Sequence, residues 1–171
     1  MRLLLITLLL LSSLYSKSGI LDIEWSKVTQ KQQKPSIPYP NVLTKGVKDT
    51  RLPVYIPRLF AYDKNMVVVA DRYFYTISFI LKDATIMISG DRTFQEDFSN
   101  QGSKFQKMMK ASNGVEFSIE EEARIITANF NKQGANYELQ IECQTKSDKR
   151  CIKEDFIKNL YKQLIVVGGK R

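Results

Sequence analysis

The segment of residues 123–165 constrains the fold of this chain more than any other part of it. Apolar and β-branched side chains fill residues 123–130, a Lys-Gln-Gly-Ala turn follows, and residues 137–143 alternate strictly between apolar and polar. Strict alternation indicates a strand with one buried face, and two such runs joined by a glycine-containing turn indicate a β-hairpin. Cys143 falls on the apolar face of the second strand, and Cys151 follows eight positions later.

The two cysteines predict a disulfide between Cys143 and Cys151, because paired cysteines of an exported chain are normally oxidised to each other. The loop that this bond closes is short, so its entropic contribution to stability would be on the order of 2–3 kcal/mol. A metal pair or a redox couple is the alternative, but neither the closer spacing with further ligands nor a Cys-x-x-Cys motif is present. We therefore expect a structural disulfide.

Export is predicted from the first residues of the chain. Arg2 is followed by an aliphatic run over residues 3–11 and then by small and polar residues. This order is typical of a secretory signal peptide, and the apolar run is shorter than the roughly 20 residues of a membrane span. We predict a signal peptide over residues 1–16, cleaved after Ser16, with Ser13 or Ser18 as the alternative site, and a periplasmic or secreted protein. An uncleaved anchor or a buried N-terminal helix is the alternative.

Residues 17–51 read as a basic arm or linker, rich in lysine and glutamine and then in proline. Three of the five prolines lie within residues 35–40, where they impose an extended and non-helical backbone. Trp25, the only tryptophan, is a candidate contact for a ligand or partner, or for the chain's own domain. We place the boundary near Arg51 and expect a single α+β domain over residues 52–171.

Further strands are predicted in the first half of this domain. Residues 66–70 form a short β-branched run that indicates a buried strand, and residues 73–81 and 84–89 alternate as the two strands of a hairpin. Phe74, Ile80 and Met87 fall on the more polar face of this hairpin. We therefore expect that face to be partly covered as well.

Residues 156–165 repeat apolar side chains at the spacing of one helix face, and Gly168 and Gly169 end the pattern. The apolar face of the strand at residues 137–143 offers this helix a surface. The predicted fold is α+β: an antiparallel sheet of about five to seven strands, with a C-terminal amphipathic helix packed on one face and stapled by one disulfide.

The connection over residues 90–113 is the least regular part of the domain. Apolar side chains recur in it among polar ones, and they either pin the connection to the core or line a binding groove. The candidate contacts for a ligand or partner in this connection are Phe94, Phe98, Phe105, Met108 and Met109.

The formal charge of +8 is unevenly distributed. Residues 52–143 hold ten Lys/Arg and twelve Asp/Glu, so the surplus of positive charge lies at the two ends of the chain. Nucleic-acid platforms concentrate positive charge on the folded face, so no nucleic-acid partner is expected. Basic ends on an exported protein suit solubility, or contact with anionic lipid or cell wall.

The residues for most enzyme chemistry are absent from the sequence. There is no histidine, so the commonest general base and metal ligand are missing, and no nucleophile elbow, phosphate loop or zinc spacing occurs. We expect no cofactor and no metal; calcium at the acidic run of residues 120–122 is the weaker alternative. A hydrolase would need two facing carboxylates. The candidates for that pair are Asp71, Asp83, Asp91, Glu96 and Asp97.

Four short motifs resemble the corresponding parts of small exported bacterial proteins of unknown function, over residues 52–169. The motifs are Leu52-Pro53-Val54, the Tyr137-x-Leu139-x-Ile141-x-Cys143 strand with Cys151 after it, Phe156-Ile157, and Gly168-Gly169. The resemblance implies a periplasmic module and brings neither an activity nor site residues.

These observations favour a non-enzymatic periplasmic module that binds or assembles with an unknown protein partner or cell-envelope component. A basic surface-associated factor that contacts anionic lipid or cell wall is one alternative. A carboxylate-based hydrolase is the other.

Overall fold

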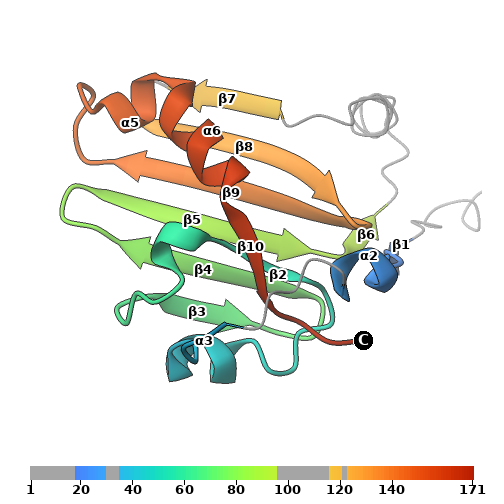
Figure 1. The fold of residues 1–171 in the computed structure, drawn as a ribbon. Coiled ribbons are helices and arrows are strands. Elements are labelled where there is room, and N and C mark those ends of the chain that lie inside the picture. Colours follow the sequence, from blue (N-terminus) through green and yellow to red (C-terminus); the bar gives the residue numbers. More distant parts are fainter. Residues whose placement is uncertain (1–17, 30–34, 96–115, 121–122) are drawn as a thin grey trace, which may run out of the picture.

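A six-stranded antiparallel sheet forms the centre of the fold in the computed structural model, which describes residues 18–29, 35–95, 116–120 and 123–171 (Figure 1). From one edge to the other, the strands are β3 (Val67–Ala70), β4 (Phe74–Ile80), β5 (Ala84–Asp91), β9 (Ala135–Cys143), β8 (Ile125–Lys132) and β7 (Glu116–Glu120). The predicted fold class, with its sheet of five to seven strands, is confirmed.

The two predicted hairpins, β4–β5 and β8–β9, are both present. Gln133 and Gly134 make the β8–β9 turn with φ values of 54° and 89°. Two positive φ values in a two-residue loop match the right-handed twist of the flanking strands. At Gly134 a Cβ atom would also collide with the backbone carbonyl of Asp22. Both the positive φ and this close contact therefore favour glycine at this position.

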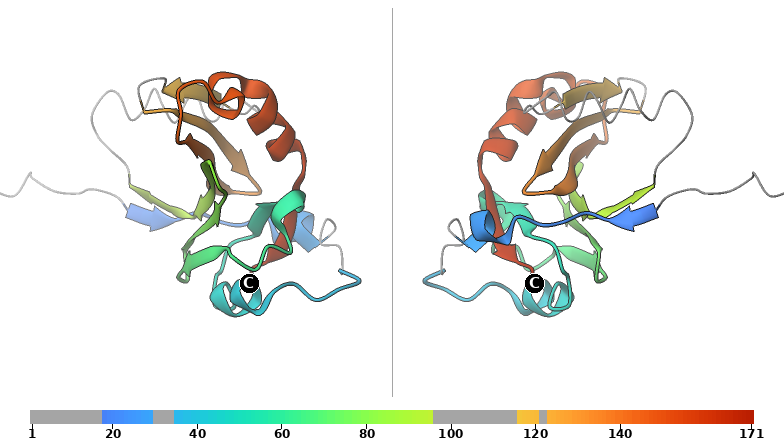
Figure 2. Two further views of the ribbon diagram at one scale, coloured as in Figure 1. Left: turned by 90° about the vertical axis from the view of Figure 1, so that its left-hand side faces the viewer. Right: turned by 90° about the vertical axis from the view of Figure 1, so that its right-hand side faces the viewer.

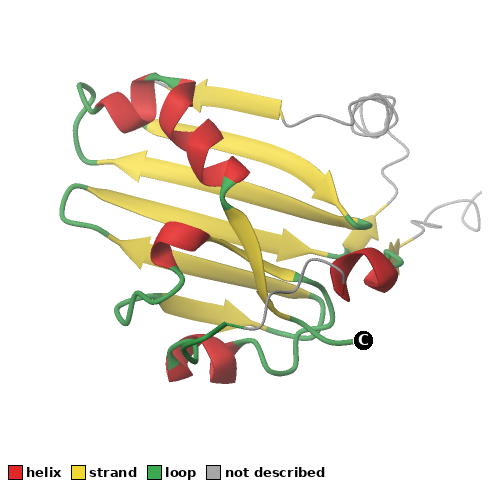
Figure 3. Ribbon diagram, in the orientation of Figure 1, coloured by secondary structure: helices red, strands yellow, loops and turns green. Residues whose placement is uncertain are grey.

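A second layer covers one face of the sheet, and Figures 1 and 3 show it on the near side. The helix α6 (Glu154–Lys162) lies over β8 and β9, and a ribbon of β2 (Val54–Pro57) and β10 (Leu164–Gly168) crosses the middle. The shorter elements of this layer are α2 (Trp25–Thr29), α3 (Asn41–Gly46), the 3-10 turn η1 (Arg58–Phe60) and α5 (Lys149–Ile152).

The core lies between the sheet and this layer. The inward positions of β4, β5, β9 and β8 are buried, and η1 contributes Phe60, whose ring stacks on Phe79 with the centroids 5.0 Å apart. From α6, Ile157 and Leu160 face the sheet. The alternation in the strands and the helical spacing in α6 therefore meet in one apolar interior.

The predicted disulfide is confirmed between Cys143 and Cys151, whose Cα atoms are 6.2 Å apart. Cys143 ends β9, and Cys151 lies in α5, which begins at an N-cap provided by Asp148. The bond therefore joins the end of the central hairpin to the start of the helical layer.

The C-terminal helix is shorter than predicted. Helical spacing extends in the sequence to Ile165, but α6 ends at Lys162, and Leu164 and Ile165 pair with Pro57 and Ile56 across the β10–β2 ribbon. The physical reason is that the β-branched residues after Leu164 suit a strand, and β2 offers them an edge with which to pair.

The described part of the segment 17–51 packs on the domain. Val28, Leu43 and Val47 are all buried in the same core as the sheet. In addition, β1 (Ser18–Ile20) pairs with β6 (Thr93–Gln95) in a two-stranded ribbon that continues from the end of β5. These residues therefore contribute to the folded body although the sequence pattern before Arg51 is weak.

The strand predicted at residues 66–70 is present as β3, but the prediction that it is buried is wrong. It is the edge strand of the sheet, and Val67 and Val69 are 48% and 57% exposed. Only Met66, before the strand, is fully buried, while Val68 faces α3. These two side chains stay exposed because the second layer packs on the opposite face of the sheet.

Candidate functional site

The outer face of the sheet is the side opposite the helical layer, and no described helix or strand lies on it in the side views of Figure 2. It consists of the outward positions of the six strands. The positions whose side chains the structure describes are Val67, Val69, Phe74, Thr76, Ser78, Ile80, Thr85, Met87, Ser89, Asp91, Ser118, Ile125, Thr127, Asn129, Asn131, Asn136, Glu138, Gln140 and Glu142.

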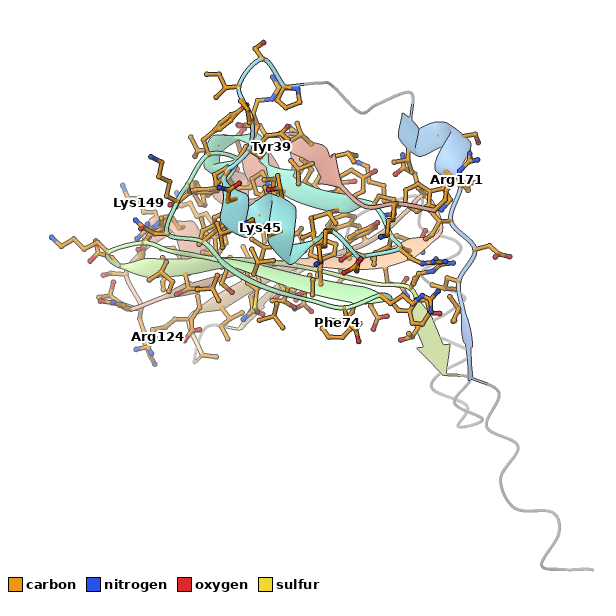
Figure 4. All side chains as sticks on the ribbon, turned by 90° about the horizontal axis from the view of Figure 1, so that it is seen from below. Tyr39, Lys45, Phe74, Arg124, Lys149 and Arg171 are labelled. Atoms are coloured by element: carbon orange, nitrogen blue, oxygen red, sulfur yellow. A yellow bond between two sulfur atoms is a disulfide. The ribbon has the colours of Figure 1, made fainter. Side chains whose placement is uncertain are left out.

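One side of the outer face is apolar. Beside the exposed valines of β3, Phe74 and Ile80 at the two ends of β4 are 42% and 60% exposed. Met87 is half-buried at the next strand, in the row of Val67. Figure 4 shows Phe74 on the opposite side of the sheet from Tyr39 and Lys45 of the covered side.

Hydroxyl groups occupy the middle of the outer face. Thr76 and Ser89 lie opposite each other on β4 and β5, and their hydroxyl oxygens are 3.0 Å apart, within hydrogen-bond distance. Ser78 and Thr85 lie on the same two strands. These hydroxyl groups lie between the valines of β3 and the strand β9, and Phe74 and Ile80 lie at the two ends of the β4 row.

Carboxylates and amides occupy the far side. Glu138 and Glu142 on β9 are outward residues, with amide side chains between and beside them, whereas Asp91 at the end of β5 lies directly opposite Phe74. None of the nineteen described outward positions of the six strands holds lysine or arginine, in a chain with 26 such residues. Arg124, in the turn before β8, is a cation at the border of this face (Figure 4).

A short wall rises at one end of the outer face. The β1–β6 ribbon bends away from the sheet toward the outer side, as the views of Figures 2 and 4 agree. Arg92 holds the bend: its guanidinium group donates two hydrogen bonds to the carbonyl of Leu21, at 3.0 and 2.7 Å, and one to that of Arg51, at 2.7 Å. The first described residues of the chain, 18–21, are thereby tied to the end of β5.

Three tyrosines hold the inner side of the sheet directly beneath this end. The hydroxyl of Tyr75 accepts a hydrogen bond from the backbone N–H of Tyr55 and donates one to its carbonyl, at 2.9 and 3.1 Å. The hydroxyl of Tyr137 donates to the carbonyl of Pro53 at 3.0 Å. Burial raises the pKa of all three tyrosines well above the usual range, so they stay neutral and the bonds between sheet and ribbon persist over the physiological range.

Lys132 and Gln133 extend this cluster to the surface. The Lys132 ammonium lies 5.1 Å from the ring centroid of Tyr55 and 5.6 Å from that of Tyr161, in the range of cation–π attraction. The hydroxyl of Tyr55 donates to the side-chain oxygen of Gln133. These contacts are on the covered side, and they fix the scaffold that positions the outer face.

The structure places only part of the predicted contact residues. Trp25 lies in α2 and packs half-buried against the core, which is its own domain. Phe94 is in β6, opposite Gly19. The remaining members of that set, Phe98, Phe105, Met108 and Met109, lie outside the described residues, and the groove prediction for them stays a prediction.

The carboxylates proposed for a hydrolase are dispersed. Asp71 accepts a hydrogen bond from the backbone of Arg72 at 2.7 Å, and Asp91 accepts two from Thr93 at 2.6 and 2.8 Å, so both are occupied in local turns. Asp83 is exposed in the β4–β5 turn, at the other end of the sheet. Glu96 and Asp97 lie outside the described residues.

The described ranges contain no group of three or more His, Cys, Asp or Glu that could hold a metal ion. The acidic run at residues 120–122, considered for calcium, falls partly outside them. Within the same ranges, no helix has the length and apolar character that a membrane span requires.

The outer face was not among the predicted contact sites. Its signal in the sequence was the presence of Phe74, Ile80 and Met87 on the polar side of a hairpin, which predicted a second cover for that side. The acidic far side had no local signal, because its members come from strands that are distant in sequence. No protein-family model, curated protein or solved structure matches this chain.

Proposed function

We propose that this chain is a non-enzymatic binding or assembly module that works after export, and that it binds a protein partner through the outer face of its sheet. The observation that carries the proposal is the group of four large apolar side chains exposed together on β3 and β4: Val67, Val69, Phe74 and Ile80. Contiguous exposed apolar groups bordered by polar ones are typical of interaction surfaces.

The size of the outer face suits a protein partner. The outer face has an area of roughly 600 Å², because its central four strands are seven to nine residues long. This area assumes about 4.8 Å between strands and about 3.4 Å per residue. A standard interface buries about 800 Å² per partner. The β1–β6 ribbon adds a raised border, on which Ile20 is 46% exposed.

The scaffold under this face favours binding without rearrangement. The disulfide, the tyrosine hydrogen bonds to β2 and the paired β2–β10 ribbon all hold the covered side of the sheet. A floor fixed in this way loses little conformational entropy when a partner binds. The side chains on the outer face would therefore be held at constant spacing.

Site-specific photo-crosslinking in cells that export the protein tests the proposal. A photoreactive residue would replace Val69, Thr85 or Gln140 on the outer face, and Lys45 or Asn159 on the covered side as matched exposed controls. We expect the three outer positions to yield one common adduct and the controls to yield none. The same adducts at the controls, or none at any outer position, would overturn the proposal.

A further inference from the structure

We infer that the partner of the outer face is a cationic amphipathic segment: apolar side chains on β3 and β4, and Lys or Arg side chains over the carboxylates of Asp91, Glu138 and Glu142. This inference rests on the proposed binding role of the face and adds the chemistry of the partner. It begins from the separation of charge across the sheet.

The charge of the outer face is opposite to that of the chain. The protein carries +8 overall, yet the described outward positions hold the carboxylates of Asp91, Glu138 and Glu142. No lysine or arginine stands among these positions to neutralise them. Such a surface of one sign attracts a partner of the other sign and repels like-charged surfaces.

The negative charge of the outer face determines which kind of macromolecule could bind to it. A second copy packed face to face would bring a surface of the same negative sign against this one, which costs free energy. Anionic lipid and nucleic acid would meet the same repulsion. A positively charged protein segment is the macromolecular occupant that both the carboxylates and the apolar side accept.

The arrangement of the stripes sets the shape of that segment. The exposed apolar residues lie on β3 and β4, and Glu138 and Glu142 lie on β9, two or three strands away. At about 4.8 Å per strand this is a separation of roughly 10–14 Å. The diameter of an α-helix with its side chains is about 10–12 Å. A helix lying along the hydroxyl stripe of Thr76 and Ser89 would therefore reach the apolar side with one flank and the carboxylates with the other.

The hydroxyl stripe is compatible with this placement. Thr76 and Ser89 share one hydrogen bond across β4 and β5, and the hydroxyl that accepts it keeps its own O–H free to donate to a polar group of the partner. The apolar side chains and the carboxylates would then determine the specificity of binding, and the hydroxyl groups between them would provide a flat contact surface.

Binding of a synthetic peptide to the exported, disulfide-bonded protein tests the inference. The probe is an 18-residue amphipathic helix of Leu and Lys with a fluorescent label, and the matched probe carries Glu in place of every Lys. We expect the Lys peptide alone to bind, with an affinity that falls as salt rises. Equal binding of the two peptides, or no binding of the Lys peptide, would overturn the inference.

Two double variants that each remove two negative charges show where the Lys peptide binds. The double variant Glu138→Gln/Glu142→Gln should weaken binding of the Lys peptide by roughly tenfold, as expected for two exposed ion pairs. The control Asp63→Asn/Asp155→Asn removes two charges from the covered side and should change the affinity less than twofold. If both doubles weaken binding equally, only net charge matters and the inference fails.

The apolar side is tested in the same way. Val69→Thr keeps the shape and β-propensity of an exposed edge residue and should weaken binding of the Lys peptide severalfold, because the added hydroxyl replaces an apolar contact. Ile152→Thr, at an exposed position of α5, is the control and should leave the affinity unchanged. No effect of Val69→Thr would remove the apolar half of the inference.

Photo-crosslinking in cells distinguishes this inference from the proposed function. If the outer-face adduct forms equally in the Glu138→Gln/Glu142→Gln background, the binding role stands and the cationic partner is refuted. If no outer-face adduct forms in the native background, both fail. An adduct with the mass of two copies of this chain would identify a second copy as the occupant and overturn the inference.

Discussion

Replacement of Gly90 by alanine tests the packing that supports the outer face. Gly90 lies on β5 directly between Tyr75 and Tyr137 in the neighbouring strands. A Cβ atom there would be 2.5 Å from Cε1 of Tyr75 and 2.8 Å from Cε1 of Tyr137. Normal carbon contacts are about 3.5–4.0 Å, so each ring would have to move by roughly 1 Å.

Neither ring has a free direction in which to move. Tyr75 is fully buried, and its hydroxyl holds both the N–H and the carbonyl of Tyr55. Overpacking of a core costs about 1–3 kcal/mol, and loss of a hydrogen bond about 1 kcal/mol more. We therefore expect Gly90→Ala to lower the free energy of unfolding by about 3 kcal/mol, and the Tm by roughly 6–12 °C for a chain of this size.

Urea unfolding followed by circular dichroism measures this loss, with Thr85→Ala on the outer side of the same strand as the control. The control should lie within about 0.5 kcal/mol of the wild type. Because the cost is assigned to the tyrosine ring, Gly90→Ala should cost less in a Tyr75→Leu background, as a double-mutant cycle reports. A loss below about 0.5 kcal/mol for Gly90→Ala, typical of a surface change, would refute the reasoning.

Three further changes have expected outcomes. Replacing Cys143 and Cys151 together by alanine should lower the free energy of unfolding by about 2.5 kcal/mol from loop closure, measured in urea, and alkylation of two thiols in the unreduced wild type would contradict the bond. Asp148→Asn should destabilise at pH 7 by about 0.5–1 kcal/mol. Its carboxylate pKa is lowered by hydrogen bonds from Arg150, so this contribution is present above the unfolded pKa and should disappear in stability curves as the pH falls below about 4. Gly134→Ala should lower the free energy of unfolding by about 1–3 kcal/mol, because alanine is strained at φ 89° and its Cβ atom would collide with the chain before α2. Limited proteolysis should then cut residues 18–28 faster; unchanged cleavage would count against the contact.

The architecture could be predicted because its signals are local. The alternation over residues 137–143, the turn at Gly134 and the apolar spacing of α6 depend on near neighbours in the chain, and each is present in the structure. The pairing of Cys143 with Cys151 followed from their number and the predicted export, and it is confirmed.

The errors came where a local pattern competed with a distant partner. Helical spacing continued to Ile165, yet β2 pairs with the last residues more than 100 positions later in the chain. The packing of Leu43 and Val47 was left open by the sequence, because their segment has no clear period. These outcomes depend on which surface is available after the rest has folded.

The sequence by itself determined the strands of the two hairpins, where the main turn lies, which cysteines join and which helix covers the sheet, because each depends on the chemistry of neighbouring residues. Only the tertiary structure decided that Val67 and Val69 lie on an uncovered edge, and that Asp91 and Glu138 face the same side. Coverage and register depend on segments far apart in the chain, so neither could be read from a local pattern. The face on which the proposed function rests is therefore a product of the tertiary structure.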